Sequence, residues 1–164
     1  MASNENVMIR PALDGEAVAA FRDLCFEYAK TLEPTAECRS LEHQGFEAEM
    51  ASLPGCYARP RGEILLAFEG DEAVGCVAMR PLSADICEMK RMYVRPAGRG
   101  RGIGRMLAEG IIAAGRERGY RAMRLDTGAT MVAAARLYRS LGFREIPAYN
   151  EDPVPGTMWF ELML

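Results

Sequence analysis

The sequence is poor in the residues from which metal centres, disulfide frameworks and membrane spans are built. It has one histidine and five cysteines, and no two cysteines form a Cys-x-x-Cys pair. Because structural zinc needs clustered cysteine and histidine ligands, we expect a reduced protein without metal. No run of about 18 uncharged apolar residues occurs, and the N-terminal segment lacks a basic start followed by an apolar stretch. We therefore expect no membrane association, no secretory signal and a cytoplasmic location.

An excess of positive charge is absent as well, since the formal net charge is −3. Residues 1–89 carry 7 basic and 16 acidic side chains, whereas residues 90–164 carry 13 and 7. No nucleic-acid partner is expected, because the chain lacks both overall basicity and a stripe of stacking aromatic residues. Between Lys90 and Arg105, however, six cations occur without one acidic residue. This local excess predicts an anion-binding site.

The hydrophobic pattern predicts one domain, residues 1–164, built on a mixed α/β sheet. The chain is 49% hydrophobic and 26% charged, which is typical of a globular protein. Helical spacing of apolar residues and short apolar runs bounded by turn residues give the elements. The predicted helices span residues 14–32, 40–53, 103–118 and 130–141, and the predicted strands span 7–10, 64–68, 73–79, 86–94, 121–126, 143–146 and 157–162. We expect the three consecutive strands within 64–94 to be antiparallel and the helices to pack on the sheet.

The most informative segment is a glycine-rich turn between a predicted strand and a predicted helix. Gly98, Gly100, Gly102 and Gly104 occupy alternate positions after Pro96, which ends the strand. Closely spaced glycines allow successive backbone N–H groups to point into one concavity. The first turn of the helix adds further unpaired N–H groups and the positive end of its dipole. The turn therefore predicts a phosphate or pyrophosphate site, with arginines at its rim.

Other interpretations of this turn fit the spacing less well. A P-loop requires a lysine followed by serine or threonine after its last glycine, and none is present here. A Rossmann turn requires Gly-x-Gly-x-x-Gly after a parallel strand, whereas this strand is expected to be antiparallel. A flexible loop with solvated arginines is the remaining alternative, although four glycines directly before a strong helical pattern argue against it.

Two separated motifs resemble the GNAT superfamily of N-acetyltransferases. The first is MYVRP at residues 92–96 followed by RGRGIG at 99–104, and the second is AARLYRSLGF at 134–143. The resemblance extends over residues 62–146. It implies an α/β (α+β) fold with a mixed, mostly antiparallel sheet of six to seven strands flanked by roughly four helices. It also implies transfer of an acetyl group from acetyl-CoA to a primary amine.

The same resemblance names the residues that would bind acetyl-CoA. In the family, the segment corresponding to Arg99–Gly104 binds the pyrophosphate, and the pantetheine lies along the strand edge before it. The residues implied are Met92, Tyr93, Val94, Arg99, Gly100, Arg101, Gly102, Ile103, Gly104 and Arg105. Backbone N–H groups around Met92–Val94 are the expected donors to the thioester oxygen. The resemblance also allows a homodimer, which is the state of many relatives.

The departing thiolate needs a proton donor. A thiol titrates near about 8.5 and a phenol near about 10, so a neighbouring tyrosine can supply the proton. The resemblance places Tyr138 at the family position that faces the acetyl-CoA sulfur, which makes Tyr138 the candidate acid. The alternative is a packing tyrosine whose hydroxyl is bonded within the protein. Many relatives carry asparagine seven residues earlier, where this chain has Met131, and Asp126 with Thr127 could supply a substitute polar group.

The attacking amine needs a base, because an alkylammonium titrates near about 10. Glu88 is the candidate, since some relatives place a catalytic glutamate at this position. On a regular strand Glu88 shares a face with Lys90, Met92 and Val94. The alternative is a structural glutamate that pairs with Lys90 or Arg80.

These features predict direct acetyl transfer within a ternary complex. A covalent cysteine intermediate is not expected, because no cysteine lies in either motif. The expected acceptor is a primary amine of a small molecule or amino acid, since the acidic N-terminal half could attract a cation. A non-catalytic acyl-CoA sensor and a protein N-acetyltransferase are the alternatives.

Overall fold

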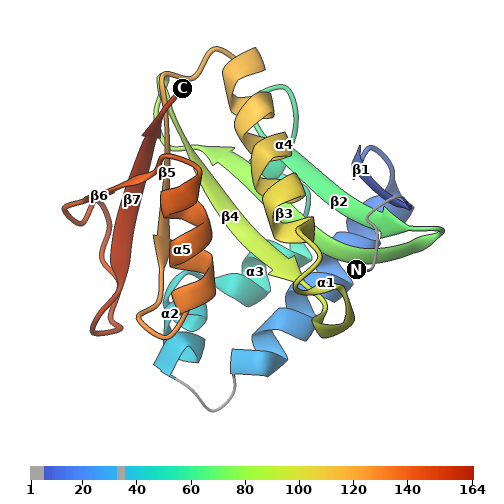
Figure 1. Cartoon of the computed structure of the whole chain (residues 1–164), viewed down its shortest axis with the longest axis horizontal. Coiled ribbons are helices and arrows are strands. Elements are labelled where there is room, and N and C mark those ends of the chain that lie inside the picture. The colour runs from blue at the N-terminus through green and yellow to red at the C-terminus, as the bar shows by residue number, and fades with distance from the viewer. Residues whose placement is uncertain (1–5, 33–35) are drawn as a thin grey trace.

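A seven-stranded sheet forms the centre of the part of the chain that the structure describes, residues 6–32 and 36–164 of a computed structural model (Figure 1). Its strands are β1 Val7–Pro11, β2 Glu63–Glu69, β3 Glu72–Pro81, β4 Ile86–Val94, β5 Ala122–Thr127, β6 Arg144–Ile146 and β7 Met158–Met163. The helices are α1 Gly15–Leu32, α2 Ala36–His43, α3 Phe46–Ala51, α4 Ile103–Glu117 and α5 Val132–Ser140, with short 3-10 turns at Gly55–Tyr57 and Pro96–Gly98.

The strands lie in the order β1-β2-β3-β4-β5-β7-β6. Among the described strands, β4 and β5 are parallel, and every other neighbouring pair is antiparallel. A parallel pair needs a long crossover, and α4 supplies it between β4 and β5. The predicted antiparallel run over residues 64–94 and the mixed, mostly antiparallel sheet are confirmed.

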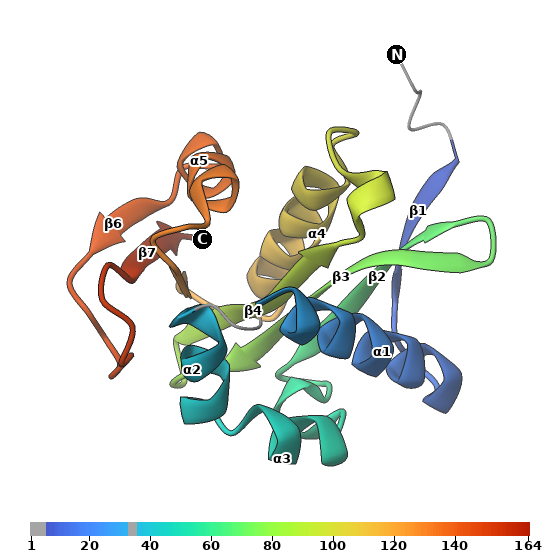
Figure 2. The same ribbon diagram turned by 90° about the horizontal axis from the view of Figure 1, so that it is seen from below.

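Helices cover both faces of the sheet, as Figure 2 shows. On one face α4 buries an aliphatic stripe that includes Leu107 and Ile111 against the sheet. On the other face α1, α2 and α3 cover a second core that includes Phe21 and Leu66. Because side chains alternate along a strand, the central strands contribute to both cores. This double burial explains why β2 and β3 read as nearly continuous apolar runs.

The side chain of Asp14 caps the N-terminus of α1. Its Oδ1 accepts a hydrogen bond from the Ala17 N–H at 2.8 Å. Asp14→Ala should lower the free energy of unfolding by about 1 kcal/mol, because an end N–H loses its acceptor and the helix dipole loses a negative partner. Urea denaturation would measure the change. An equal loss for Asp23→Ala, at an exposed position in the body of α1, would contradict the capping explanation.

The single helix predicted over residues 40–53 is wrong, because the structure has two short helices there. Gly45 takes a left-handed conformation, with φ +72°, and its N–H bonds the Glu42 carbonyl at 3.1 Å. A glycine in this conformation ends one helix and redirects the chain into the next with little strain. The break places Gln44 beside β4, where it accepts hydrogen bonds from Lys90 and Arg91.

No helix within residues 6–32 and 36–164 combines the length and apolar character needed to cross a bilayer. The described side chains also form no group of three or more histidine, cysteine, aspartate or glutamate residues suited to a metal ion.

Candidate active site

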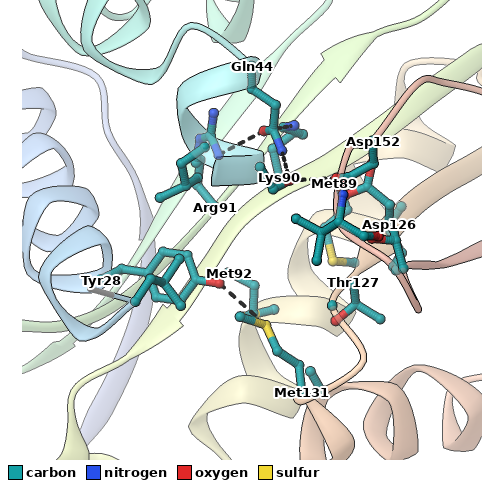
Figure 3. Close-up of a pocket in the computed structure, with 18 of the residues that line it drawn as sticks. Tyr28, Gln44, Met89, Lys90, Arg91, Met92, Asp126, Thr127, Met131 and Asp152 are labelled. Atoms are coloured by element: carbon teal, nitrogen blue, oxygen red, sulfur yellow. Dashed lines mark hydrogen bonds between the residues drawn. The ribbon is translucent and has the colours of Figure 1, made fainter. Parts of the chain in front are cut away.

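β4 and β5 separate beyond Glu88 (Figure 1), and side chains line a cavity between them (Figure 3). Their ladder joins residues 86–88 to residues 122–124 and has no further pair in the described strands. Past this point, residues 89–92 and residues 125–128 line a first cavity of about 150 Å³, together with side chains from α1, α2 and α5. The edge of β4 that faces this cavity therefore carries backbone groups that β5 does not use.

A β-bulge at Arg91 and Met92 interrupts the regular alternation of β4. From Lys90 to Tyr93 the strand advances by three residues while β3 advances by two. Arg91 has φ +59°, in the left-handed region that bulky residues rarely adopt. The extra residue reverses which side chains face which side of the sheet from that point on.

The bulge overturns one step of the sequence reasoning. Met92 and Val94 pack against the core under α4. Glu88 lies on the opposite face, two residues from Lys90, which pairs with Ala78 of the second core. The expectation that Glu88 shares a face with Met92 and Val94 is therefore wrong, whereas the shared face with Lys90 is confirmed. A bulge changes the alternation without any strong local signal, so the spacing alone did not show it.

Backbone N–H groups without protein acceptors form the turn before α4. Among the described residues, none of the N–H groups of residues 100–105 makes a hydrogen bond, and the first helical bond joins the Met106 N–H to the Gly102 carbonyl at 3.1 Å. Gly100 and Gly102 have φ values of +73° and +77°, a conformation that glycine adopts without strain. The turn thus presents successive donors at the positive end of the α4 dipole, an arrangement suited to a pyrophosphate.

The arginines of this turn differ in their contacts. Arg101 pairs with Glu69 of β2 at 2.7 Å, and Arg105 pairs with Glu109 in the next turn of α4 at 3.1 Å. Arg99 is exposed and forms no ion pair with any described side chain. The guanidinium of Arg99 is therefore the one available at the rim of the turn, while Arg101 offers chiefly its backbone N–H.

Tyr138 lies on α5 and lines the first cavity while being only 6% exposed. Its ring packs against Phe143 and Phe160, with centroid separations of 5.8 and 6.5 Å. Within the described residues its hydroxyl has no recorded hydrogen-bond partner. Burial raises the pKa of the phenol, so it is protonated at neutral pH. Packing holds the ring in place. The alternative of a packing tyrosine requires a hydrogen bond from this hydroxyl to another protein group, and the described residues show none.

The end of β5 supplies polar groups to the same cavity. Asp126 and Thr127 line it, close to Met131, whose sulfur accepts a hydrogen bond from the Tyr28 hydroxyl at 3.4 Å. Asp126 Oδ2 accepts a hydrogen bond from Asn150 Nδ2 at 2.7 Å. Burial raises the pKa of the Asp126 carboxyl above its usual range. Asp126 and Thr127 thus provide polar groups in the same cavity as Met131.

Glu88 is almost completely buried, at 1% exposed, and does not line the first cavity. Its Oε1 accepts a hydrogen bond from Arg80 Nε at 2.8 Å, and its Oε2 accepts one from the Tyr149 hydroxyl at 2.6 Å. Arg80 is one of the two partners, with Lys90, that were named for a structural glutamate at this position. Tyr149 had not been singled out in the sequence, because it lies in the irregular segment between β6 and β7 and belongs to no motif.

A chain of hydrogen bonds crosses the wall of the cavity (Figure 3). The Lys90 ammonium donates to Gln44 Oε1 at 2.6 Å, and Gln44 Nε2 donates to Ser40 Oγ at 3.0 Å. Ser40 Oγ in turn donates to Asp152 Oδ2 at 2.5 Å. These residues come from β4, the α2 region and the segment before β7, so no single motif could have indicated them. Burial and the neighbouring Arg91 charge lower the pKa of Lys90.

The chain matches known acetyltransferases in sequence. A family model described as the acetyltransferase (GNAT) family matches residues 20–143. An uncharacterized N-acetyltransferase of Schizosaccharomyces pombe is 40% identical over 124 residues, covering 74% of this chain and 76% of the relative. Human N-acetylaspartate synthetase is 33% identical over 141 residues, covering 84% of this chain and 45% of the human protein.

Solved structures show the same fold. An acetyltransferase from Streptococcus agalactiae aligns with a TM-score of 0.79 at 18% identity, covering 98% of this chain and 99% of that one. A putative acetyltransferase from Salmonella typhimurium, solved with its cofactor acetyl-CoA, aligns with a TM-score of 0.67 at 21% identity, covering 96% and 94%. The sequence matches show that the chain belongs to the GNAT family of N-acetyltransferases.

Proposed function

We propose that this enzyme transfers the acetyl group of acetyl-CoA directly to the primary amine of a small molecule or amino acid. The observation that carries the proposal is the set of unpaired N–H groups of residues 100–105, beside the unpaired edge of β4 and the first cavity. The turn would hold the pyrophosphate, and the edge of β4 would direct the pantetheine toward Tyr138. The names of the N-acetylaspartate synthetases, whose product is an acetylated amino acid, support an amino-acid acceptor.

In the proposed reaction, the ammonium form of the acceptor first loses a proton to a base. The neutral nitrogen then forms a bond to the thioester carbon, and the carbon–sulfur bond breaks. The thiolate takes a proton from the Tyr138 hydroxyl, and the nitrogen gives up its second proton to restore the phenol. Backbone N–H groups at the bulge of β4 would stabilise negative charge on the carbonyl oxygen. The products are an acetylated amine, free CoA thiol and one released proton.

Two carboxyl groups are candidates for the base. Glu88 is the residue favoured by the family position, but Arg80 and Tyr149 occupy its oxygens, so it would act through the Tyr149 hydroxyl or a water. Asp126 lines the cavity directly, and its raised pKa brings it closer to neutral pH, where a general base is most effective. We therefore propose Asp126 as the group that first receives the proton, with Glu88 as the alternative.

Parallel pH–rate profiles of Asp126→Asn and Glu88→Gln should separate these roles. A carboxylate base is active above its pKa, so the wild-type kcat should fall as the pH drops through the raised pKa of Asp126. Asp126→Asn should lower kcat at neutral pH by at least about tenfold and remove this acidic limb. Glu88→Gln should keep the limb. Loss of the limb in Glu88→Gln alone would identify Glu88 as the base instead.

The proposed function itself is tested by calorimetry and a thiol-release assay. The protein should bind CoA and acetyl-CoA but not ATP, and should release free thiol in the presence of a suitable amine. Binding without thiol release across a panel of amines and peptides would favour the acyl-CoA sensor. Release with peptides but not with small amines would favour a protein N-acetyltransferase. Absence of acetyl-CoA binding would refute the proposal.

A further inference from the structure

A second cavity, of about 240 Å³, adjoins the first one on the side of α3. The two cavities share the side chains of Gln44, Lys90 and Arg91 as their common wall. Figure 3 shows these three residues together at one end of the first cavity, with Asp126 toward another side. A ligand that entered both cavities would therefore pass beside Lys90.

The second cavity is lined by more positive than negative charge. Arg80, Lys90 and Arg91 are its cations, and Glu49 is its carboxylate among the described residues. Arg91 and Glu49 satisfy each other, since two guanidinium nitrogens of Arg91 bond Glu49 Oε2. Arg80 is paired with the buried Glu88, so Lys90 is the cation of this lining that forms no ion pair with a described side chain, and the cavity favours a ligand with a negative group.

Both of these remaining cations have donor capacity to spare. Lys90 takes part in none of the ion pairs among the described side chains, and its bond to Gln44 Oε1 uses one of three ammonium N–H groups. Arg80 uses its Nε–H on Glu88, which leaves the N–H groups of its terminal nitrogens for another acceptor. Because a half-buried cation without an anionic partner is costly, a carboxylate that bonds Lys90 and also accepts from the terminal nitrogens of Arg80 would be favoured.

The first cavity adds two carboxyl side chains to the shared Lys90 and Arg91. Asp126 and Asp152 line it, and the Asp126 oxygen that does not bond Asn150 has no recorded donor among the described residues. Asp152 is already engaged by Ser40 and by the Val154 N–H. An ammonium group would thus meet Asp126 in the first cavity, close to Tyr138 and the edge of β4. The first cavity thus contains the carboxylate of Asp126, and the second contains the guanidinium of Arg80. Lys90 lines both cavities.

We infer that the acceptor is an amine that also carries a carboxylate, with its nitrogen at Asp126 in the first cavity and its carboxylate bound by Lys90 and Arg80 in the second. This inference rests on the proposed function and narrows its substrate class to amino acids. The sequence predicted that acidic residues of the N-terminal half attract the acceptor. In this inference the acceptor amine is instead bound by Asp126, and its carboxylate is bound by cations. Glu88 then acts as a positioning residue for Arg80, since their bond orients the guanidinium toward the second cavity.

The inference is tested with pairs of acceptors that differ only in the carboxylate, such as an amino acid and its carboxamide. For the wild-type protein, kcat/KM should be at least about tenfold higher for the amino acid, because one charge-assisted contact is worth about that factor. Lys90→Gln should raise KM for the amino acid by a similar factor and leave KM for the carboxamide and the Kd of acetyl-CoA unchanged. The matched control is Lys30→Gln, which removes the only other lysine, in the last turn of α1.

Binding measurements keep this test separate from the test of the proposed function. Calorimetry of the CoA-loaded protein should show that the amino acid binds more tightly than the carboxamide, and that Lys90→Gln removes the difference. Equal affinity for both, or an unchanged preference in Lys90→Gln with a wild-type melting temperature, would overturn the inference. If acetyl-CoA bound and carboxylate-free amines were acetylated equally well, the inference would fail while the proposed function stood.

Discussion

Replacing Tyr138 with phenylalanine should lower kcat by at least about tenfold while the Kd of acetyl-CoA changes little. The substitution keeps the ring that packs on Phe143 and Phe160, so the fold should be retained. It removes a hydroxyl that is protonated at neutral pH and faces the cavity. Burial raises the pKa of the phenol and so makes it a weaker acid. The CoA thiolate would leave in the same buried environment, which raises the pKa of the thiol as well, so the proton transfer stays feasible.

Single-turnover kinetics with acetyl-CoA and an acceptor would measure this effect, because they report the chemical step rather than product release. Tyr120→Phe is the matched control, since it removes another buried tyrosine hydroxyl, one that donates to the Arg61 carbonyl away from both cavities. A wild-type rate in Tyr138→Phe would remove this residue from the mechanism and leave it a packing residue. A fall in Tyr120→Phe of equal size would indicate general loss of stability.

Replacing Gly102 with valine should weaken acetyl-CoA binding by at least about tenfold. Gly102 has φ +77° and directly precedes α4, where a branched side chain is strained by about 1–2 kcal/mol. The chain would relieve this strain by rotating the backbone, which would turn the N–H groups of residues 100–105 away from a common point. Calorimetry with CoA well below the melting temperature would measure the loss.

Gly104→Ala is the matched control for this prediction. Gly104 lies within the helix, and a Cβ there would meet Leu137 at 3.7 Å and Val94 at 3.9 Å, which are ordinary contacts. Binding should therefore stay close to that of the wild type. If Gly102→Val bound CoA normally while Gly104→Ala did not, the anion site would depend on side-chain space rather than on the orientation of the backbone.

The glycine-rich turn could be predicted from the sequence because its properties are local. Pro96 ends a strand, glycines permit left-handed backbone, and the apolar stripe of the following helix fixes where the dipole begins. These effects act within about ten residues, and the structure places the unpaired N–H groups as the pattern indicated. The cap at Asp14 and the antiparallel run of β2, β3 and β4 are local in the same way.

The acceptor side of the site could not be predicted in this way. Gln44 reaches β4 only because Gly45 breaks a helix, and Tyr149 reaches Glu88 from an irregular segment 61 residues away. Met92 and Val94 face away from Glu88 because of a bulge in β4. Side chains alternate regularly before and after that bulge, so the spacing in the sequence does not reveal it. Each of these placements depends on contacts between segments that are distant in the sequence. Residue spacing within one sequence predicts local structure and does not predict such contacts.

The sequence by itself determined most of the order of elements, the glycine-rich turn before α4 and the place of Tyr138 on a helix, because backbone conformation and the buried face of an element are set by neighbouring residues. Only the tertiary structure decided that β4 and β5 part beyond Glu88, that a bulge reverses the faces of β4, and that Lys90 lines both the cavity of Asp126 and the cavity of Arg80. The physical reason is that register and packing between remote segments determine where side chains converge. The cavities are lined by residues from distant segments, whereas the turn before α4 is formed by consecutive residues.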